Sequence, residues 1–215
     1  MASVILITNP SHDIATKYLD AWITSIIFSI GHNHNNVEIC ELKGTNATRE
    51  ELGKIIKDKN PGMVLFHGHG SHDSIEGYRC VLINCQMNLD MLKERTVHSL
   101  SCDSGKTLGP KLISAGSDAF VGYKEEFKFI HLNKSNEKER LSDPVAIYFL
   151  GPAFEAVKAL IGGKTAREAY EISQDEYRDQ LRFLLTANIA SANNIATTIA
   201  SLVYHNLTNQ VCYTA

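Results

Sequence analysis

The 215-residue sequence has few of the features that mark specialised classes of protein. It contains five prolines, one tryptophan and five cysteines, and it has neither an internal repeat nor a low-complexity tract. This composition excludes collagen, coiled-coil, disordered and disulfide-knot scaffolds. The charges nearly cancel, with 21 Lys and Arg against 24 Asp and Glu. Because there is no basic excess, we expect neither nucleic acid nor an anionic membrane as a partner.

Long hydrophobic runs and paired cysteines are also missing. No stretch approaches the ~20 apolar residues of a membrane span, and the initial MASVILITNP lacks the basic segment of a secretory signal. The five cysteines are odd in number and show no Cys-x-x-Cys spacing, which is typical of reduced thiols in a cytosol. We therefore expect a soluble, cytoplasmic chain in which any one cysteine is free for chemistry.

Short apolar runs alternate with helical patterns over the first 130 residues. Ser11 and Thr48 are each suited to cap a helix, and Thr48 begins a Thr-Arg-Glu-Glu capping box. The pattern predicts strands at 4–8, 37–42, 63–66, 96–101 and 119–123, helices at 11–30, 48–59 and 105–115, and a short hairpin at 78–89. This alternation predicts an α/β fold, a three-layer αβα sandwich with a mainly parallel sheet.

The remaining third of the sequence is first polar and then helical. Residues 128–142 are lysine-rich and predict an exposed loop, whose length also fits an activation or autocleavage loop. Helical patterns follow at 143–161, 165–183 and 186–206. The tail lacks the strand signals of an independent α/β domain. We therefore predict a single domain over 1–215, in which 143–215 is a mostly helical C-terminal part.

Two of the predicted strands end in reactive side chains. One leads into His67-Gly68-His69-Gly70-Ser71 and the next into Leu100-Ser101-Cys102-Asp103. Open α/β sheets bind ligands beyond the carboxyl ends of their strands. If these strands are neighbours, a histidine and a cysteine face each other about one strand spacing (~4.8 Å) apart. A nearby imidazole activates a thiol for nucleophilic attack.

Backbone groups beside these residues fit the same chemistry. A helix that begins near Gly105 is expected to favour the thiolate of Cys102 through its N-terminal dipole. The N–H groups of Gly70 and Cys102 are suited to form an oxyanion hole. The pattern therefore indicates covalent thiol catalysis, with a histidine as the base.

A strand that ends in Gly68-His69-Gly70-Ser71, followed by one that ends in a small residue and Cys102, resembles the clan CD cysteine peptidases. These include caspases, legumain, gingipains, clostripain and separase. The sequence looks nearest to the CHAT-type bacterial proteases, and this similarity continues through Leu108-Gly109, Ala115-Gly116 and Phe120-Val121-Gly122. The resemblance implies a caspase-like fold, with His69 as the base and Cys102 as the nucleophile.

The resemblance also implies a set of partners. It implies a protein or peptide substrate and no required cofactor, although some relatives use calcium. CHAT relatives often act in bacterial defence and are switched on by another protein, which suggests an activating partner here by analogy. Family members generally rely on a dyad, so no third orienting residue is assigned.

The pocket for the substrate side chain is open to two interpretations. In legumain, clostripain and caspases the position two before the nucleophile is polar, whereas here it is Leu100. An acidic pocket for Arg or Lys would then need Glu125, Glu126 or Asp103. The alternative is an apolar pocket without a preference for basic side chains.

Other hypotheses compete with the dyad. His67 is an alternative base. His67-x-His69-x-x-His72 crowds imidazoles next to Asp73 as a zinc hydrolase would, and it resembles the metallo-β-lactamase signature with the Asp and His order swapped. A third hypothesis is a non-catalytic caspase-like binding module. Cys40, Cys80, Cys85 and Cys212 lack such companions and are expected to be structural.

Overall fold

The structure, a computed structural model, describes residues 3–31, 37–191 and 194–215. Its centre is a six-stranded sheet with the strand order β2-β1-β3-β6-β7-β8, in which β8 alone among these strands runs antiparallel to its neighbour. The six strands are β1 (Ser3–Asn9), β2 (Val37–Lys43), β3 (Met63–His67), β6 (Thr96–Leu100), β7 (Ala119–Tyr123) and β8 (Gln210–Thr214). Two further strands, β4 (Ser74–Glu76) and β5 (Val81–Asn84), form a separate antiparallel pair.

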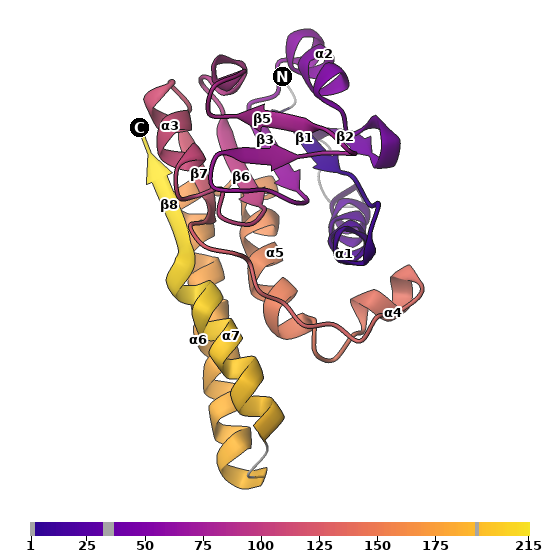
Figure 1. Cartoon of the computed structure of the whole chain (residues 1–215), viewed down its shortest axis with the longest axis vertical. Coiled ribbons are helices and arrows are strands. Elements are labelled where there is room, and N and C mark those ends of the chain that lie inside the picture. Colours follow the sequence, from indigo (N-terminus) through magenta and orange to yellow (C-terminus); the bar gives the residue numbers. More distant parts are fainter. Residues whose placement is uncertain (1–2, 32–36, 192–193) are drawn as a thin grey trace.

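Helices cover both faces of the large sheet (Figure 1). One face carries α1 (Ile14–Gly31), α5 (Ile147–Ile161) and the start of α6 (Ala166–Ser191). Helix α7 (Asn194–Asn209) packs on α5 and α6, and α6 and α7 extend together beyond the sheet (Figure 1). The other face carries α2 (Arg49–Lys59), α3 (Leu108–Ser114) and the β4-β5 pair. The short α4 (Glu137–Leu141) and the 3-10 turns Gly44–Asn46 and Leu89–Leu92 lie in connections. The predicted three-layer αβα sandwich, mainly parallel sheet and extra C-terminal helices are confirmed, and the arrangement is consistent with a caspase-like fold.

Each face of the sheet has its own hydrophobic core. Leu65 and Leu100 pack with α1 and α5 on one side, whereas Phe66 and Val97 pack with α2 and α3 on the other. All four side chains are almost completely buried, and each contributes roughly 1.5–3 kcal/mol to the hydrophobic stabilisation. Because both faces are covered, the strands need no polar alternation.

The helix starts show which caps the sequence predicted correctly. Thr48 caps α2 as predicted, because its hydroxyl accepts a hydrogen bond from the Glu51 N–H at 3.3 Å. The predicted Ser11 cap is wrong. Ser11 has a left-handed backbone (φ 47°) and its hydroxyl donates to Asp20 at 2.8 Å. Helix α1 begins later, at Ile14, and Asp13 accepts from the Thr16 N–H at 2.8 Å.

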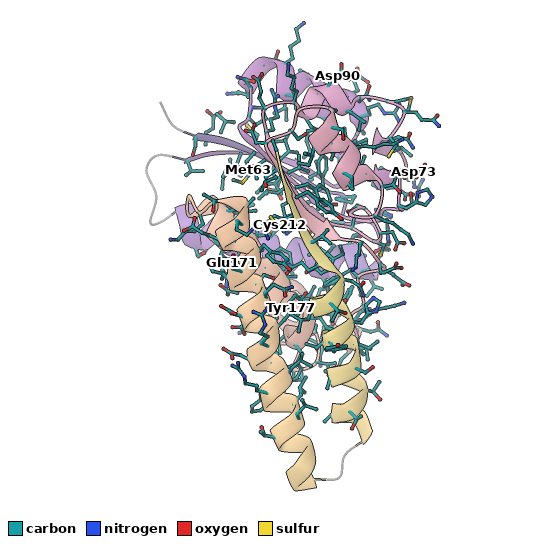
Figure 2. The ribbon with its side chains drawn as sticks, turned by 90° about the vertical axis from the view of Figure 1, so that its left-hand side faces the viewer. Met63, Asp73, Asp90, Glu171, Tyr177 and Cys212 are labelled. Carbon is teal, nitrogen blue, oxygen red and sulfur yellow. The ribbon has the colours of Figure 1, made fainter. Side chains whose placement is uncertain are left out.

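Strand β8 was not predicted from the sequence. It pairs with β7 from Ala119 opposite Thr214 to Tyr123 opposite Gln210, and so covers an edge that would otherwise be open. Gln210 anchors its start by donating to Ser173 of α6 at 2.8 Å. The labels in Figure 2 mark Tyr177 on α6 and Cys212 on β8. A strand of five residues directly after a helix is too short for its apolar–polar alternation to be distinguished from the helical pattern by sequence alone.

Several boundaries also differ from the prediction. Helix α6 continues to Ser191 instead of ending near 183, and the junction with α7 falls at 192–193, outside the described residues. Helix α3 begins at Leu108 instead of near Gly105. The predicted hairpin at 78–89 is the β4-β5 pair, which begins earlier, at Ser74. No helix in the described parts of the chain combines the length and hydrophobicity needed to cross a bilayer.

Candidate active site

The sheet reverses its direction of winding between β1 and β3. From β1 the chain moves outward to β2, then returns past β1 to β3 and continues to β6. Such a reversal leaves a crevice at the carboxyl ends of the strands where ligands bind in open α/β sheets. The predicted adjacency of the two reactive strands is confirmed, because β3 and β6 pair in parallel with His67 opposite Leu100. The segments after β1, β3 and β6 therefore meet at one edge.

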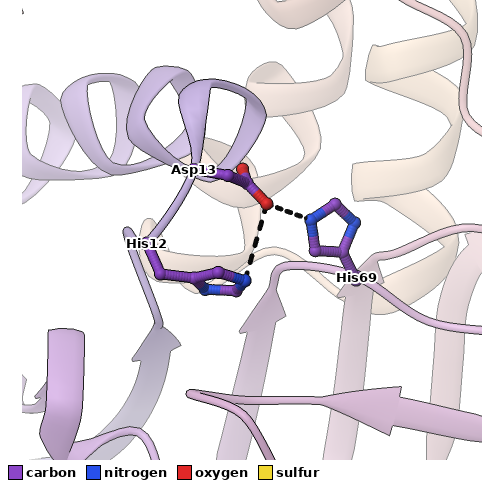
Figure 3. Close-up of side chains that lie close together, drawn as sticks. All are labelled: His12, Asp13 and His69. Carbon is purple, nitrogen blue, oxygen red and sulfur yellow. Dashed lines mark hydrogen bonds and ion pairs between the residues drawn. The ribbon is translucent and has the colours of Figure 1, made fainter.

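His69 and Asp13 form the closest polar contact at this edge. The His69 Nε2 atom lies 2.5 Å from Asp13 Oδ2 (Figure 3). The other carboxylate oxygen, Oδ1, accepts hydrogen bonds from the Thr16 N–H at 2.8 Å and from the Thr16 hydroxyl at 2.9 Å. The carboxylate that caps α1 is thereby fixed, with one oxygen directed at the imidazole.

Electrostatics keep Asp13 ionised. Burial by itself raises its pKa, but hydrogen bonds from Thr16 and His69 and the nearby imidazole outweigh burial and lower the pKa to about 2. Asp13 was not predicted from the sequence, because the resemblance implies a dyad without a third orienting residue. The signal that points to it is the Asp13-x-x-Thr16 spacing directly after a strand, where a capping carboxylate is carried to the sheet edge.

His69 and Cys102 line one cavity. The cavity has a volume of about 280 Å³, and Cys102 is partly buried in its wall. Its lining comes from four segments that share the carboxyl edge of the sheet: Ala15, Thr16 and Leu19 of α1, Gly68 and His69 after β3, Leu100, Ser101 and Cys102 at the end of β6, and Glu126, Phe127, Lys128, Phe129 and His131 after β7.

The Cys102 thiol is neutral in this setting. Burial is the largest effect and raises its pKa. A hydrogen bond from the Phe127 backbone lowers the pKa in part, and the carboxylates of Glu126 and Asp103 raise it again against the charge of Lys128, so that the pKa lies above its ordinary value. The expectation that a helix N-terminus favours the thiolate is wrong, because α3 begins only at Leu108. A base must therefore remove the thiol proton when the sulfur attacks.

Gly70 lets the two reactive loops approach closely. A Cβ atom at this position would lie 2.8 Å from the Ser101 Cβ atom and 3.2 Å from the Cys102 carbonyl oxygen. Within residues 3–31, 37–191 and 194–215, neither the Gly70 N–H nor the Cys102 N–H donates a hydrogen bond to a protein group. Both predicted oxyanion donors therefore keep their hydrogen-bonding capacity for a ligand.

His67 lies away from the cavity. Its side chain is 1% exposed and stacks on Phe154, with ring centroids 5.3 Å apart, and neither ring nitrogen has a hydrogen-bond partner. Burial lowers its pKa well below the ordinary value. It is thus enclosed between the sheet and α5, where it reaches no substrate, so the alternative of His67 as the base is not supported by the geometry.

The histidines expected to bind zinc are not assembled. Among the residues whose placement is described, His69 forms a group of potential metal ligands with His12 and Asp13, and this group contains neither His67 nor His72. The zinc triad predicted from His67, His69 and His72 is therefore wrong, because His67 is the last residue of β3 and is buried, whereas His69 and His72 lie in the loop after β3 with their side chains nearer the surface.

The four predicted substrate-contacting residues divide into two pairs. Leu100 and Glu126 line the cavity. Asp103 and Glu125 lie outside this lining: the Asp103 N–H donates to the Glu125 carbonyl oxygen at 3.3 Å, and the Glu125 carboxylate lies 3.4 Å from Lys106 Nζ. The second pair links the loops after β6 and β7.

The chain is remotely similar to solved structures of known proteins. No protein-family model matches the chain, and no curated protein matches it. Among solved structures, a secreted C11 cysteine protease from Bacteroides thetaiotaomicron, in complex with an irreversible peptide inhibitor, superimposes with a TM-score of 0.44 and 8% identity. The match covers 59% of this chain and 49% of the protease, so the chain spans about half the protease's length.

Proposed function

We propose that this chain is a cysteine-type peptidase in which Cys102 is the nucleophile and His69 is the general base. The observation that carries the proposal is one cavity lined by both residues, with the Asp13 carboxylate against the imidazole. A neutral thiol, a base and two unpaired N–H donors are the components of acyl transfer.

The contact with Asp13 selects the nitrogen that acts as the base. Asp13 is ionised and accepts the proton on His69 Nε2, so the lone pair resides on Nδ1. The Nδ1 atom takes the proton from Cys102 Sγ while the sulfur attacks the scissile carbonyl carbon. The oxyanion accepts hydrogen bonds from the N–H groups of Gly70 and Cys102.

The remaining steps return each group to its starting state. Protonated Nδ1 donates its proton to the leaving amine as the carbon–nitrogen bond breaks, which leaves a thioester on Cys102. Water then attacks the thioester while Nδ1 accepts a proton from it. The carbon–sulfur bond breaks to release the acid product, and Nδ1–H returns its proton to the sulfur, which regenerates the thiol and the neutral imidazole. Asp13 touches neither substrate nor thiol in this scheme and is a positioning residue.

The cavity favours an apolar side chain at the residue before the cleaved bond. Its walls include Ala15, Leu19, Leu100, Phe127 and Phe129, all of which are apolar. Glu126, the one carboxylate in the lining, forms an ion pair with Lys128, which is also in the lining. With its charge matched, Glu126 has less capacity to recognise Arg or Lys. We infer that the apolar alternative is the correct one.

Family, compartment and regulation belong to the same proposal. The motifs around His69 and Cys102 support a clan CD peptidase of the CHAT type that cleaves protein or peptide substrates and is switched on by a protein partner in bacterial defence or signalling. All five cysteines are free thiols, which supports a reducing, cytoplasmic setting. No cofactor enters the chemistry of these residues.

Covalent labelling tests the nucleophile directly. The full chain is treated with peptidyl acyloxymethyl ketones that carry an apolar or a basic P1 residue, and the intact mass is measured. One adduct on Cys102 is expected, which Cys102→Ala abolishes and Cys85→Ala, a change at another partly buried thiol, leaves in place. A chain that iodoacetamide alkylates at Cys102 but no ketone labels contradicts the proposal.

A further inference from the structure

We propose that His12, Asp13 and His69 form a zinc site that switches the peptidase off. The inhibition rests on the proposed function, whereas the zinc site itself does not. One ligand atom from each of the three residues lies within 4.8 Å of the others, which makes them a potential metal-binding group within the described residues. Figure 3 shows the carboxylate of Asp13 between the two imidazoles.

The donor set matches a specific class of ion. Two imidazole nitrogens and a carboxylate oxygen are ligands of Zn²⁺, which binds them at about 2.0–2.2 Å and accepts irregular geometry because its d shell is full. Three protein ligands leave a fourth position open to water or to another ligand. Other first-row divalent ions bind the same donors with lower affinity than Zn²⁺, with the exception of Cu²⁺.

The distances require only small movements. Ligands of a tetrahedral zinc ion lie roughly 3.3–3.5 Å apart. The His12 Nε2 atom is already 3.5 Å from Asp13 Oδ2. The His69 Nε2 atom is 2.5 Å from the same oxygen, so this pair opens by about 1 Å through side-chain rotation when the ion enters.

The surroundings hold two of the three ligands in place. Asp13 Oδ1 is engaged by Thr16, which leaves Oδ2 as the ligand atom. The backbone N–H of His12 donates a hydrogen bond to the Thr16 hydroxyl at 3.0 Å. The His12 ring packs edge-on against the Tyr78 ring, with ring centroids 5.9 Å apart. Supporting contacts of this kind orient metal ligands and raise affinity.

Zinc on this site removes the base from the reaction. Coordination uses the lone pair of His69 Nε2, so the imidazole proton moves from Nε2 to Nδ1. An Nδ1–H group donates a hydrogen bond and has no lone pair in the ring plane to accept the thiol proton. The metal also takes the Asp13 oxygen that orients the ring. Zinc and proton transfer to His69 are therefore mutually exclusive.

A change at His12 tests the metal site without altering a residue of the proposed reaction. His12 is exposed, does not line the cavity and has no role in the proposed reaction. A His12→Ala change therefore removes one zinc ligand and leaves the Asp13–His69 contact in place. His72, another exposed histidine on the loop after β3, is the matched control because it lies outside the ligand group.

Metal binding is measured first, independently of activity. The full chain with Cys102→Ala, which lacks the thiol ligand, is titrated with Zn²⁺ by calorimetry and with Co²⁺ by visible absorption. We expect one ion per chain, and an affinity that falls at least about 10-fold in His12→Ala and is unchanged in His72→Ala. Zinc affinity that does not respond to His12→Ala overturns the site.

Inhibition is measured second, on the chain that retains Cys102. Zinc is expected to slow ketone labelling, EDTA to restore it, and His12→Ala to keep the rate without zinc while shifting inhibition to at least about 10-fold higher zinc. Labelling that continues with the site loaded overturns the regulatory role. If Cys102 is never labelled but zinc binds in a His12-dependent way, the metal site stands and the peptidase proposal fails.

Discussion

The imidazole of His69 and the carboxylate of Asp13 are 2.5 Å apart although 56 positions separate them in the chain. The contact joins the segment after β1 to the segment after β3, across the point where the sheet reverses its winding. Asp13 reaches this position because it also caps α1. One residue therefore couples the start of a helix to the orientation of the proposed base.

Asp13→Asn is expected to slow the reaction without loosening the helix. Asparagine is as good an N-cap as aspartate, so its amide oxygen still accepts from Thr16, but its neutral amide no longer fixes the Nε2 proton of His69. General-base catalysis is worth 10²–10⁴-fold. We expect kinact for the best ketone to fall about 100-fold, with KI nearly unchanged.

Asp13→Ala is the matched comparison, because it also removes the cap and costs about 1 kcal/mol of stability. Urea unfolding of both variants separates the two roles. If Asp13→Asn labels as fast as the unchanged chain at every pH, Asp13 does not position the base.

Alkylation of the resting thiol is expected to rise with pH well into the alkaline range. Burial and the carboxylates of Glu126 and Asp103 raise the pKa of Cys102, and only the thiolate reacts with iodoacetamide. The rate at Cys102, measured by peptide mass, should increase roughly tenfold per pH unit between 6 and 8. A plateau from about pH 6 would instead reveal a preformed thiolate–imidazolium pair.

The fold is expected to lose stability in mild acid because of two buried histidines. His98 is fully buried, its ring nitrogens have no partners, and burial lowers its pKa to about 4. Burial and then the proximity of His98 lower the pKa of His67. Between about pH 6.5, the unfolded value, and pH 4, the unfolded chain binds protons that the folded chain does not. Stability therefore falls as pH falls.

The size of this effect is measurable by urea unfolding at pH 7 and pH 4.5. For His98 the shift corresponds to about 3 kcal/mol once the pH has reached its folded pKa. His98→Leu should reduce the loss between the two pH values, because an apolar side chain carries no proton and leaves no buried nitrogen unpaired. His72→Ala, at the surface, should leave the loss as it is. Equal losses in both variants would rule out His98 as a source.

Gly70→Ala is expected to disturb the site more than the fold. The added methyl group would meet Ser101 Cβ at 2.8 Å and the Ser74 carbonyl oxygen at 3.0 Å, so the two reactive loops must separate. Such overpacking costs about 1–3 kcal/mol, and displaced oxyanion donors should lower ketone labelling at least about 10-fold. Gly62→Ala, whose methyl group would meet nothing within 4 Å, should change neither quantity.

The P1 preference is expected to be apolar and independent of Glu126. Across a ketone panel with Leu, Phe, Asp and Arg at P1, the apolar reagents should label fastest because apolar residues dominate the cavity walls. Glu126→Gln should leave that order unchanged. Fast labelling by the Arg reagent that disappears in Glu126→Gln would show instead that the carboxylate recognises a basic side chain.

Local pattern was enough to predict most of the fold and four residues that line the candidate site, namely His69, Leu100, Cys102 and Glu126. The apolar runs that became β1, β3 and β7 are readable because strands buried on both faces consist almost wholly of apolar residues. The glycines and small residues after β3 and β6 mark the loops that carry His69 and Cys102. These features depend on neighbours in the chain, which the sequence displays directly.

Tertiary structure alone decided what faces these residues. Asp13 lies beside His69, and His67 is buried against Phe154, because the winding of the sheet brings β1 next to β3 and α5 over it. The raised pKa of Cys102 follows from burial and charges contributed by the loops after β6 and β7. Contacts between residues that are distant along the chain are determined by strand order and by packing. Neither strand order nor packing has a local signature in the sequence.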